Sequence, residues 1–273
     1  MFFEVLFWEQ LVCNFPLFIF LVGIAFVYSY LLKSFTTIRL YQKQPQLFFL
    51  SLSLLFLIIG SPLSAFSHLS FSLHMIQMSI LYFIVPPIML LGIPYSMFKK
   101  AITIIPMVKR ISRLFLPPKY ALFLFAFLFL MYHLPGIMKV LSQNYLIQNG
   151  FLLLLFILSF SMWWPIVSPN PKQRFSKEEK KRYAFLNGVI LMPACILFIF
   201  NALIVGMDNP FLTQMTAYLC LPPQNEPLNL LPSPFNTKFD HIMSGILMLG
   251  MHKFGIMLSL RLGNSELDVT ATS

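Results

Sequence analysis

The sequence predicts an all-α, polytopic membrane protein, a bundle of seven transmembrane helices, and two observations lead to this class. The first is composition: 58% of the 273 residues are hydrophobic and only 10% are charged, whereas a soluble domain carries about 25% charged residues. The second is seven apolar stretches, each about long enough for a helix to cross a bilayer core roughly 30 Å thick. This composition excludes a cytosolic globular enzyme, a nucleic-acid-binding domain and a disordered chain.

The seven stretches together make residues 1–273 a single integral membrane domain. All are expected to be helices, because lipid cannot satisfy the backbone groups of an open sheet edge. The fourth stretch is the shortest and is expected to extend toward Pro117, and Pro86-Pro87 is expected to kink the third. The predicted spans are residues 16–32, 46–66, 70–98, 120–134, 145–167, 184–205 and 240–260.

The basic residues are distributed very unevenly between the two ends of these spans. Lys139 and Lys238 fall at one end, and Lys253 lies inside the last span. Because basic residues gather on the cytoplasmic side, this pattern predicts an external N-terminus, an internal C-terminus and an external Met207–Lys238 loop. The other sixteen of the 19 basic residues all fall at the opposite end: Lys33, Arg39, Lys43, Lys99, Lys100, Lys109, Arg110, Arg113, Lys119, Lys172, Arg174, Lys177, Lys180, Lys181, Arg182 and Arg261.

Four of the five histidines fall near the predicted outer membrane face. His68 precedes the third span and His74 is one turn into it, while His133 ends the fourth span and His241 begins the seventh beside Asp240. These positions are far apart in sequence, yet the topology brings them to one depth. Ionisable groups at membrane depth are costly and tend to be functional. The alternative is that each histidine is only a hydrogen-bonded polar anchor.

The residue types in this outer set suit a soft metal. Met78 follows His74 by four residues, so both side chains lie on one helix face. Imidazole and thioether ligands suit Cu(I), and Asp240 is placed either to orient His241 or to act as a harder ligand. The alternative for Met78 is simple core packing. No HExxH, GxSxG, P-loop or GxGxxG motif is present, so we expect no catalysis.

His252 and Lys253 lie deep in the seventh span. Charged side chains at this depth are expected to face protein or water and not lipid. One interpretation is that both bond to neighbouring helices, such as the one that carries Asn201. The other is a second metal or proton station below the outer site.

The run GSPLSAFSHLSFSLHMIQMSILYFIVPPIMLLGIP, residues 60–94, resembles the central signature of the CtaG family. Members of this family are multi-span membrane proteins that assist assembly of the caa-type cytochrome c oxidase in Gram-positive bacteria. Further matches are His133-Leu134-Pro135, Trp163-Trp164-Pro165 and Asp240 with Gly245. The chain departs from the family pattern at two positions: Met78 stands where many members have histidine, and Gln148-Asn149 stands where many have another.

The resemblance implies a bacterial cell-membrane protein that helps to assemble a haem–copper oxidase. The predicted mechanism is transient capture of Cu(I) by His74, Met78, His133 and His241, assisted by His68 or Asp240. A chaperone must release its metal, which favours an incomplete and exposed ligand set. The implied partners are the oxidase subunits, the lipid bilayer and a copper donor, and no nucleic acid. Two alternatives stay open: a transporter for a metal ion or protons, and a structural partner that stabilises the oxidase without binding metal.

Overall fold

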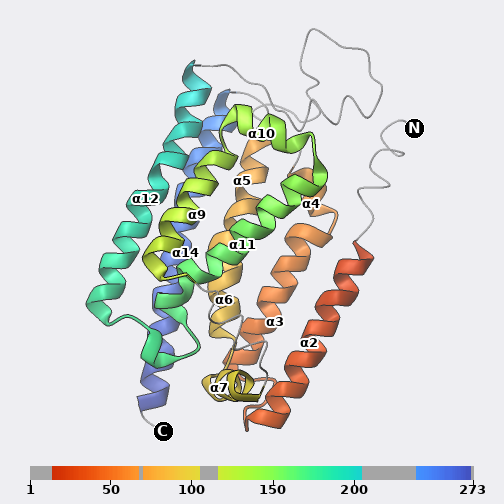
Figure 1. Ribbon diagram of the computed structural model, residues 1–273, viewed down its shortest axis with the longest axis vertical. Helices are drawn as coiled ribbons and strands as arrows, with labels where there is room; N and C mark the ends of the chain where they lie inside the picture. Colours follow the sequence, from red (N-terminus) through yellow and green to blue (C-terminus); the bar gives the residue numbers. More distant parts are fainter. Residues whose placement is uncertain (1–13, 68–69, 105–115, 205–237, 272–273) are drawn as a thin grey trace.

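The structure is a computed structural model, and it describes residues 14–67, 70–104, 116–204 and 238–271. All regular secondary structure in these residues is helical and none is strand, so the predicted all-α class is confirmed. The long helices run along the vertical axis of the bundle, with α11 oblique to the others (Figure 1). The long elements are α2 (Phe15–Phe35), α3 (Lys43–Leu55) with η1 (Phe56–Gly60), α5 (Phe71–Ser79) with η2 (Ile80–Ile84) and α6 (Val85–Leu91), α9 (Pro118–Tyr132), α11 (Tyr145–Val167), α12 (Lys177–Ile204) and α14 (Lys238–Ala271).

Four short elements connect the long ones. In Figure 1, α7 lies across the lower end of the bundle and α10 lies at the upper end. The connections after α2, α6 and α11 all lie at the lower end, where α14 also ends. The short elements are α4 (Leu63–Phe66), α7 (Tyr95–Ile104), α10 (Pro135–Ser142) and η3 (Pro171–Gln173). The basic residues that were predicted to be cytoplasmic, where the structure describes them, therefore lie at one end of the molecule.

Five helical segments in the described residues are long and apolar enough to cross a membrane. The apolar helix α9 is shorter, with 15 residues, and begins at Pro118, as the expected extension toward Pro117 implied. Helix α12 runs through the sixth predicted span but is not among the five. The count of seven spans and their orientation therefore stay predictions. The five segments are Phe15–Phe35, Lys43–Gly60, Phe71–Leu91, Leu146–Val167 and Phe239–Gly263.

Two predicted spans are longer than the helices that form there. The third was predicted to continue to residue 98, but its helix ends at Leu91 and α7 begins separately at Tyr95. The carbonyl of Gly92 accepts a 2.6 Å hydrogen bond from the Tyr28 hydroxyl. A Cβ on Gly92 would lie 2.6 Å from the backbone nitrogen of Phe48, so only glycine allows this approach. The second prediction also ran too far, because α4 is separate from the segment that ends at Gly60.

The double proline in the third segment has a structural consequence. A proline provides no N–H, so carbonyls one turn before it lose their helical donor. The chain forms the π-helical turn η2 here, which is the expected distortion of the span. The Tyr82 carbonyl accepts a 2.9 Å hydrogen bond from Nε1 of Trp163 in α11. The Phe83 carbonyl faces α14, where a Cβ on Gly255 would lie only 2.5 Å from it. The distorted turn therefore fixes both α11 and α14 against the centre.

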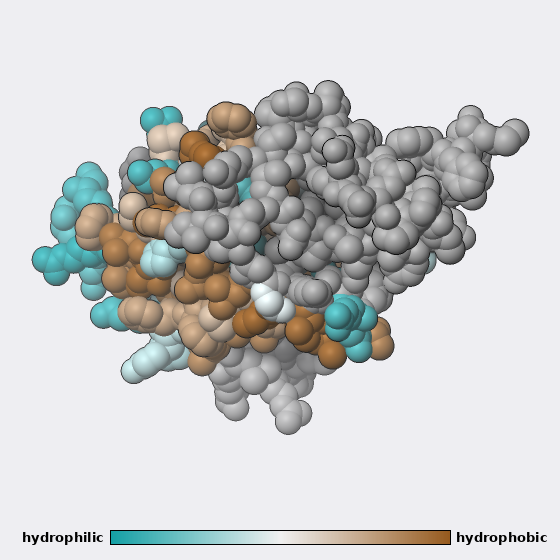
Figure 2. Space-filling model, turned by 90° about the horizontal axis from the view of Figure 1, so that it is seen from above, coloured by the Kyte–Doolittle hydropathy of each residue, from teal (hydrophilic) through white to brown (hydrophobic). Residues whose placement is uncertain are grey.

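The outer surface of the bundle is strongly apolar. Seen from above, hydrophobic residues form much of the described surface (Figure 2). In α2, Phe20, Phe26 and Tyr30 are each more than 60% exposed. Such surfaces are normal where lipid replaces water around the helices.

Candidate metal site

The first turn of α5 is fixed by a carboxylate from α14. Asp240 accepts hydrogen bonds from the Ser70 hydroxyl at 2.8 Å and from the backbone N–H groups of Phe71 at 3.0 Å and Ser72 at 3.2 Å. The Ser72 hydroxyl in turn donates to the Asp240 carbonyl at 2.9 Å. Asp240 therefore caps a helix from a different part of the chain, and its negative charge lies at the positive end of the α5 dipole. The sequence suggested a metal-related role for Asp240 and gave no signal for this cap.

His133 follows the last residue of α9, and its ring orientation is set by the turn before it. Its Nδ1 lies 2.7 Å from the carbonyl oxygen of Phe129. Since a carbonyl only accepts, Nδ1 carries the proton and the lone pair of the neutral ring is on Nε2. Metal-binding histidines commonly have this arrangement, in which one ring nitrogen donates to a backbone carbonyl and the other is the ligand.

His74 and His133 come together from α5 and the end of α9. Their ring centroids are 6.4 Å apart, and the Tyr132 ring lies 6.1 Å from His74 and 5.0 Å from His133. The two histidines are only 3% and 1% exposed. The sequence favoured an exposed ligand set, whereas this pair is buried, because the end of α9, which packs against α11 and α12, brings His133 to His74 in α5.

The remaining members of the predicted set occupy different surroundings. Met78 lies one turn after His74 in α5 and is also buried. His241 packs edge-on against Phe71, with ring centroids 4.0 Å apart. His68 lies outside the described residues. In the part of the chain that the structure describes, no three His, Cys, Asp or Glu side chains lie close enough to hold a metal ion. From the described residues, a metal at the histidine pair would therefore have the two imidazoles alone or the two imidazoles with thioether ligands.

The deep polar residues of α14 have separate environments. His252 is buried, and its Nε2 lies 3.0 Å from Oδ1 of Asn187 in α12. This is the helix that carries Asn201, so for His252 the expected interhelical bond forms, through Asn187. Lys253 is exposed on the surface of the bundle, so it does not face the protein interior, which was one of its two expected surroundings. A long lysine side chain can extend its ammonium toward the membrane surface.

Tyr132 is the neighbour of the histidine pair that sequence reasoning missed. It is buried, and its ring also stacks on Phe151 of α11, with centroids 5.8 Å apart. Its position directly before His133 was the available signal, but a tyrosine among so many aromatic residues does not stand out.

These features define an all-helical membrane protein with a buried histidine pair near one end of the bundle, close to a helix cap made by a distant carboxylate. Residues 27–260 match the family model of the cytochrome c oxidase caa3 assembly factor. The match covers most of the chain, so the chain belongs to this family, as the signature around residues 60–94 indicated. No curated protein and no solved structure shows significant similarity to the chain.

Proposed function

We propose that this protein assists assembly of a caa-type oxidase in the bacterial cell membrane by holding Cu(I) transiently between His74 and His133. The ion would then pass to an oxidase subunit docked beside the bundle. The family assignment supports the oxidase as the client, and the histidine pair supports copper as the cargo.

The separation of the two rings is the observation that carries this proposal. A metal–imidazole bond is about 2.0 Å long, so two imidazoles that share one ion on opposite sides have ring centroids roughly 6 Å apart. The observed separation is 6.4 Å. The proton on Nδ1 of His133 directs its lone pair to Nε2, the nitrogen a metal would use. Cu(I) accepts soft ligands, and the Met78 thioether lies one helical turn from His74.

His241, His68 and Asp240 have supporting roles in this proposal. The Asp240 carboxylate is engaged with the first turn of α5, so it would set the position of His74 one turn further on and would not bind the ion directly. His241, which packs against Phe71 in the same first turn, would be a further ligand when the ion passes to the oxidase, and His68, the other predicted assistant, lies outside the described residues.

A structural role without metal is the second candidate. It is favoured by the absence of a third His, Cys, Asp or Glu ligand in the described residues and by the aromatic packing of His133 against Phe129 and Tyr132. A transporter is less well supported, because His252 bonds to Asn187 and Lys253 lies at the surface.

Cu(I) titration of the purified protein under reducing conditions tests the copper role. We expect about one Cu(I) per chain, and we expect His74→Ala and His133→Ala each to weaken binding at least tenfold. His252→Ala is the matched control, because it removes a buried histidine outside the pair. Equal binding by His133→Ala and His252→Ala would reject this site.

Complementation separates the two candidate functions. Deletion of the protein should abolish caa-type oxidase activity, and His74→Ala at normal protein level should restore little of it. Full restoration by His74→Ala would favour the structural role.

A further inference from the structure

Lys180 is an unusually buried lysine near the start of α12. Only 2% of its surface is exposed, whereas lysine is almost never fully buried unless it is paired. Within the described part of the chain, its ammonium has no ion pair and no hydrogen bond, and its nitrogen is not among the fully buried side-chain atoms. A cation with so little of its residue exposed and no counter-charge is costly, so the missing partner calls for an explanation.

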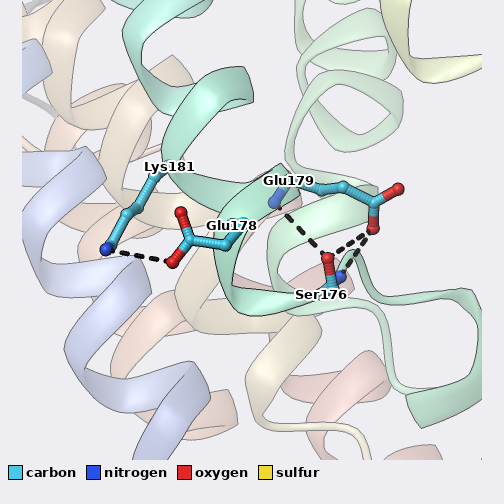
Figure 3. A network of polar contacts seen from close by, with 4 residues as sticks. All are labelled: Ser176, Glu178, Glu179 and Lys181. Atoms are coloured by element: carbon cyan, nitrogen blue, oxygen red, sulfur yellow. Dashed lines mark hydrogen bonds and ion pairs between the residues drawn. The ribbon is translucent and has the colours of Figure 1, made fainter.

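The two acidic residues in the same turn bind elsewhere. Glu178 pairs with Lys181 at 3.2 Å. The Glu179 carboxylate accepts hydrogen bonds from the backbone N–H of Ser176 at 2.9 Å and from its hydroxyl at 2.8 Å, which form a capping box at the helix start. These hydrogen bonds lower the pKa of Glu179. Figure 3 shows both carboxylates directed to these partners, so neither neutralises Lys180.

A second cation, Arg174, lies six residues before Lys180, in the connection between α11 and α12. Arg174 donates from Nε to the Ser168 carbonyl at 2.6 Å and from Nη1 to the Gly263 carbonyl at 3.3 Å. These contacts hold its guanidinium where α11 ends and α14 passes. Burial lowers the pKa of Lys180, and the charge of Arg174 lowers it further. Arg174 and Lys180 are therefore two cations at the end of the bundle where α11 ends and α12 begins.

The depth of this place matches the headgroup layer of a membrane. Lys180 lies four residues before the predicted start of the sixth span, which is about 6 Å along a helix. Trp164, whose Nε1 donates to Gln173 at 3.1 Å, is at the same end of the bundle, and tryptophan is enriched at membrane interfaces. The cytoplasmic leaflet, where this basic end is predicted to lie, is rich in anionic lipid.

We propose that Lys180, with Arg174 beside it, binds a phosphate group, and that this phosphate belongs to an anionic phospholipid. The lysine stem packs between the helices and its ammonium meets the phosphate, while choline headgroups are disfavoured because they bring their own cation. The inference is independent of copper binding.

Thermal unfolding in nanodiscs tests the proposal. The wild-type protein is compared in phosphatidylglycerol and in phosphatidylcholine, beside Lys180→Met and the control Lys181→Met, which removes an exposed lysine from the same turn. We expect phosphatidylglycerol to raise the melting temperature of the wild type and of Lys181→Met. Lys180→Met should lose most of this shift and bind phosphatidylglycerol about fivefold more weakly, the effect of one lysine at a membrane surface.

The same variant reports whether Lys180 has a partner inside the protein. In phosphatidylcholine, Lys180→Met should be at least as stable as the wild type, because the change removes an unneutralised charge. The proposal would be overturned if Lys180→Met lowered the melting temperature equally in phosphatidylcholine and in phosphatidylglycerol. It would also be overturned if phosphatidylglycerol raised the melting temperature of Lys180→Met as much as that of the wild type. A Lys180-dependent shift caused by inorganic phosphate in detergent, at matched ionic strength, would support the phosphate site and assign it to the free ion.

Discussion

The central segment Phe71–Leu91 and the peripheral helix α2 differ in burial in a way that their hydropathy would not suggest. Helix α2 is the more apolar of the two, yet only 17% of its apolar window is buried, against 72% for the central segment. In water the more apolar helix would occupy the core. Around this bundle, lipid solvates apolar side chains as well as protein does, so hydrophobicity does not select the central helix.

Polar groups and close backbone contacts instead determine that the segment Phe71–Leu91 lies at the centre of the bundle. The central segment contains the buried His74, and Gln77 donates to the Ile58 carbonyl in the neighbouring helix at 2.8 Å. Its distorted turn offers the Tyr82 carbonyl to Trp163. Helix α2 contributes one such bond to this region, from Tyr28 to Gly92. The comparison teaches that polar bonds and close backbone approach hold this bundle together.

The largest effect is expected at the cap of the central segment. Asp240→Ala would leave three donors of the α5 first turn without their acceptor, and we expect a loss of about 3 kcal/mol or more in the free energy of unfolding, since hydrogen bonds to charged groups contribute roughly 1.5–3 kcal/mol each. Asp240→Asn retains one acceptor oxygen and should lose about half as much. Chemical unfolding in detergent measures both, and equal stability of the three proteins would contradict the role of the cap.

A smaller effect is expected where α14 meets the distorted turn. Gly255→Ala places a Cβ 2.5 Å from the Phe83 carbonyl, and forcing the two backbones apart should cost about 1–3 kcal/mol. Gly250→Ala is the matched control on the same helix, because a Cβ there meets no atom within 4 Å. It should leave stability unchanged or raise it by up to about 1 kcal/mol through helix propensity. The same sign for both variants in thermal unfolding would count against close packing at this turn.

The sequence predicted the helices better than their ends. The stretch 145–167 forms a helix with those bounds, because length and hydropathy are local properties. The end of the third segment at Leu91 was missed, because it depends on the contact of Gly92 with Phe48 and Tyr28, residues that are distant in sequence. The sequence of this turn did not by itself show that the helix ends at Leu91.

The candidate site was predicted in part for a similar reason. Alternating spans bring His74 and His133 to one depth, which the sequence could show, and the structure places their rings 6.4 Å apart. Rotation of each helix about its axis is set by packing against several neighbours. The sequence therefore could not show that Asp240 faces the start of α5 or that Lys253 faces outward.

The smallest effect is expected on the outer face of α2, and it sharpens the comparison most. Phe26 is 73% exposed, so Phe26→Ala should change the free energy of unfolding in detergent by less than about 0.5 kcal/mol. Tyr28→Phe, two residues along on the inner face, deletes the hydrogen bond to Gly92 and should cost about 1 kcal/mol despite the smaller change in volume. In detergent, Tyr28→Phe should therefore be more destabilising than Phe26→Ala. If Phe26→Ala were the more destabilising change, the outer face of α2 would have to pack against protein in the purified sample. The apolar surface of α2 would then contribute to stability together with the polar contacts inside the bundle.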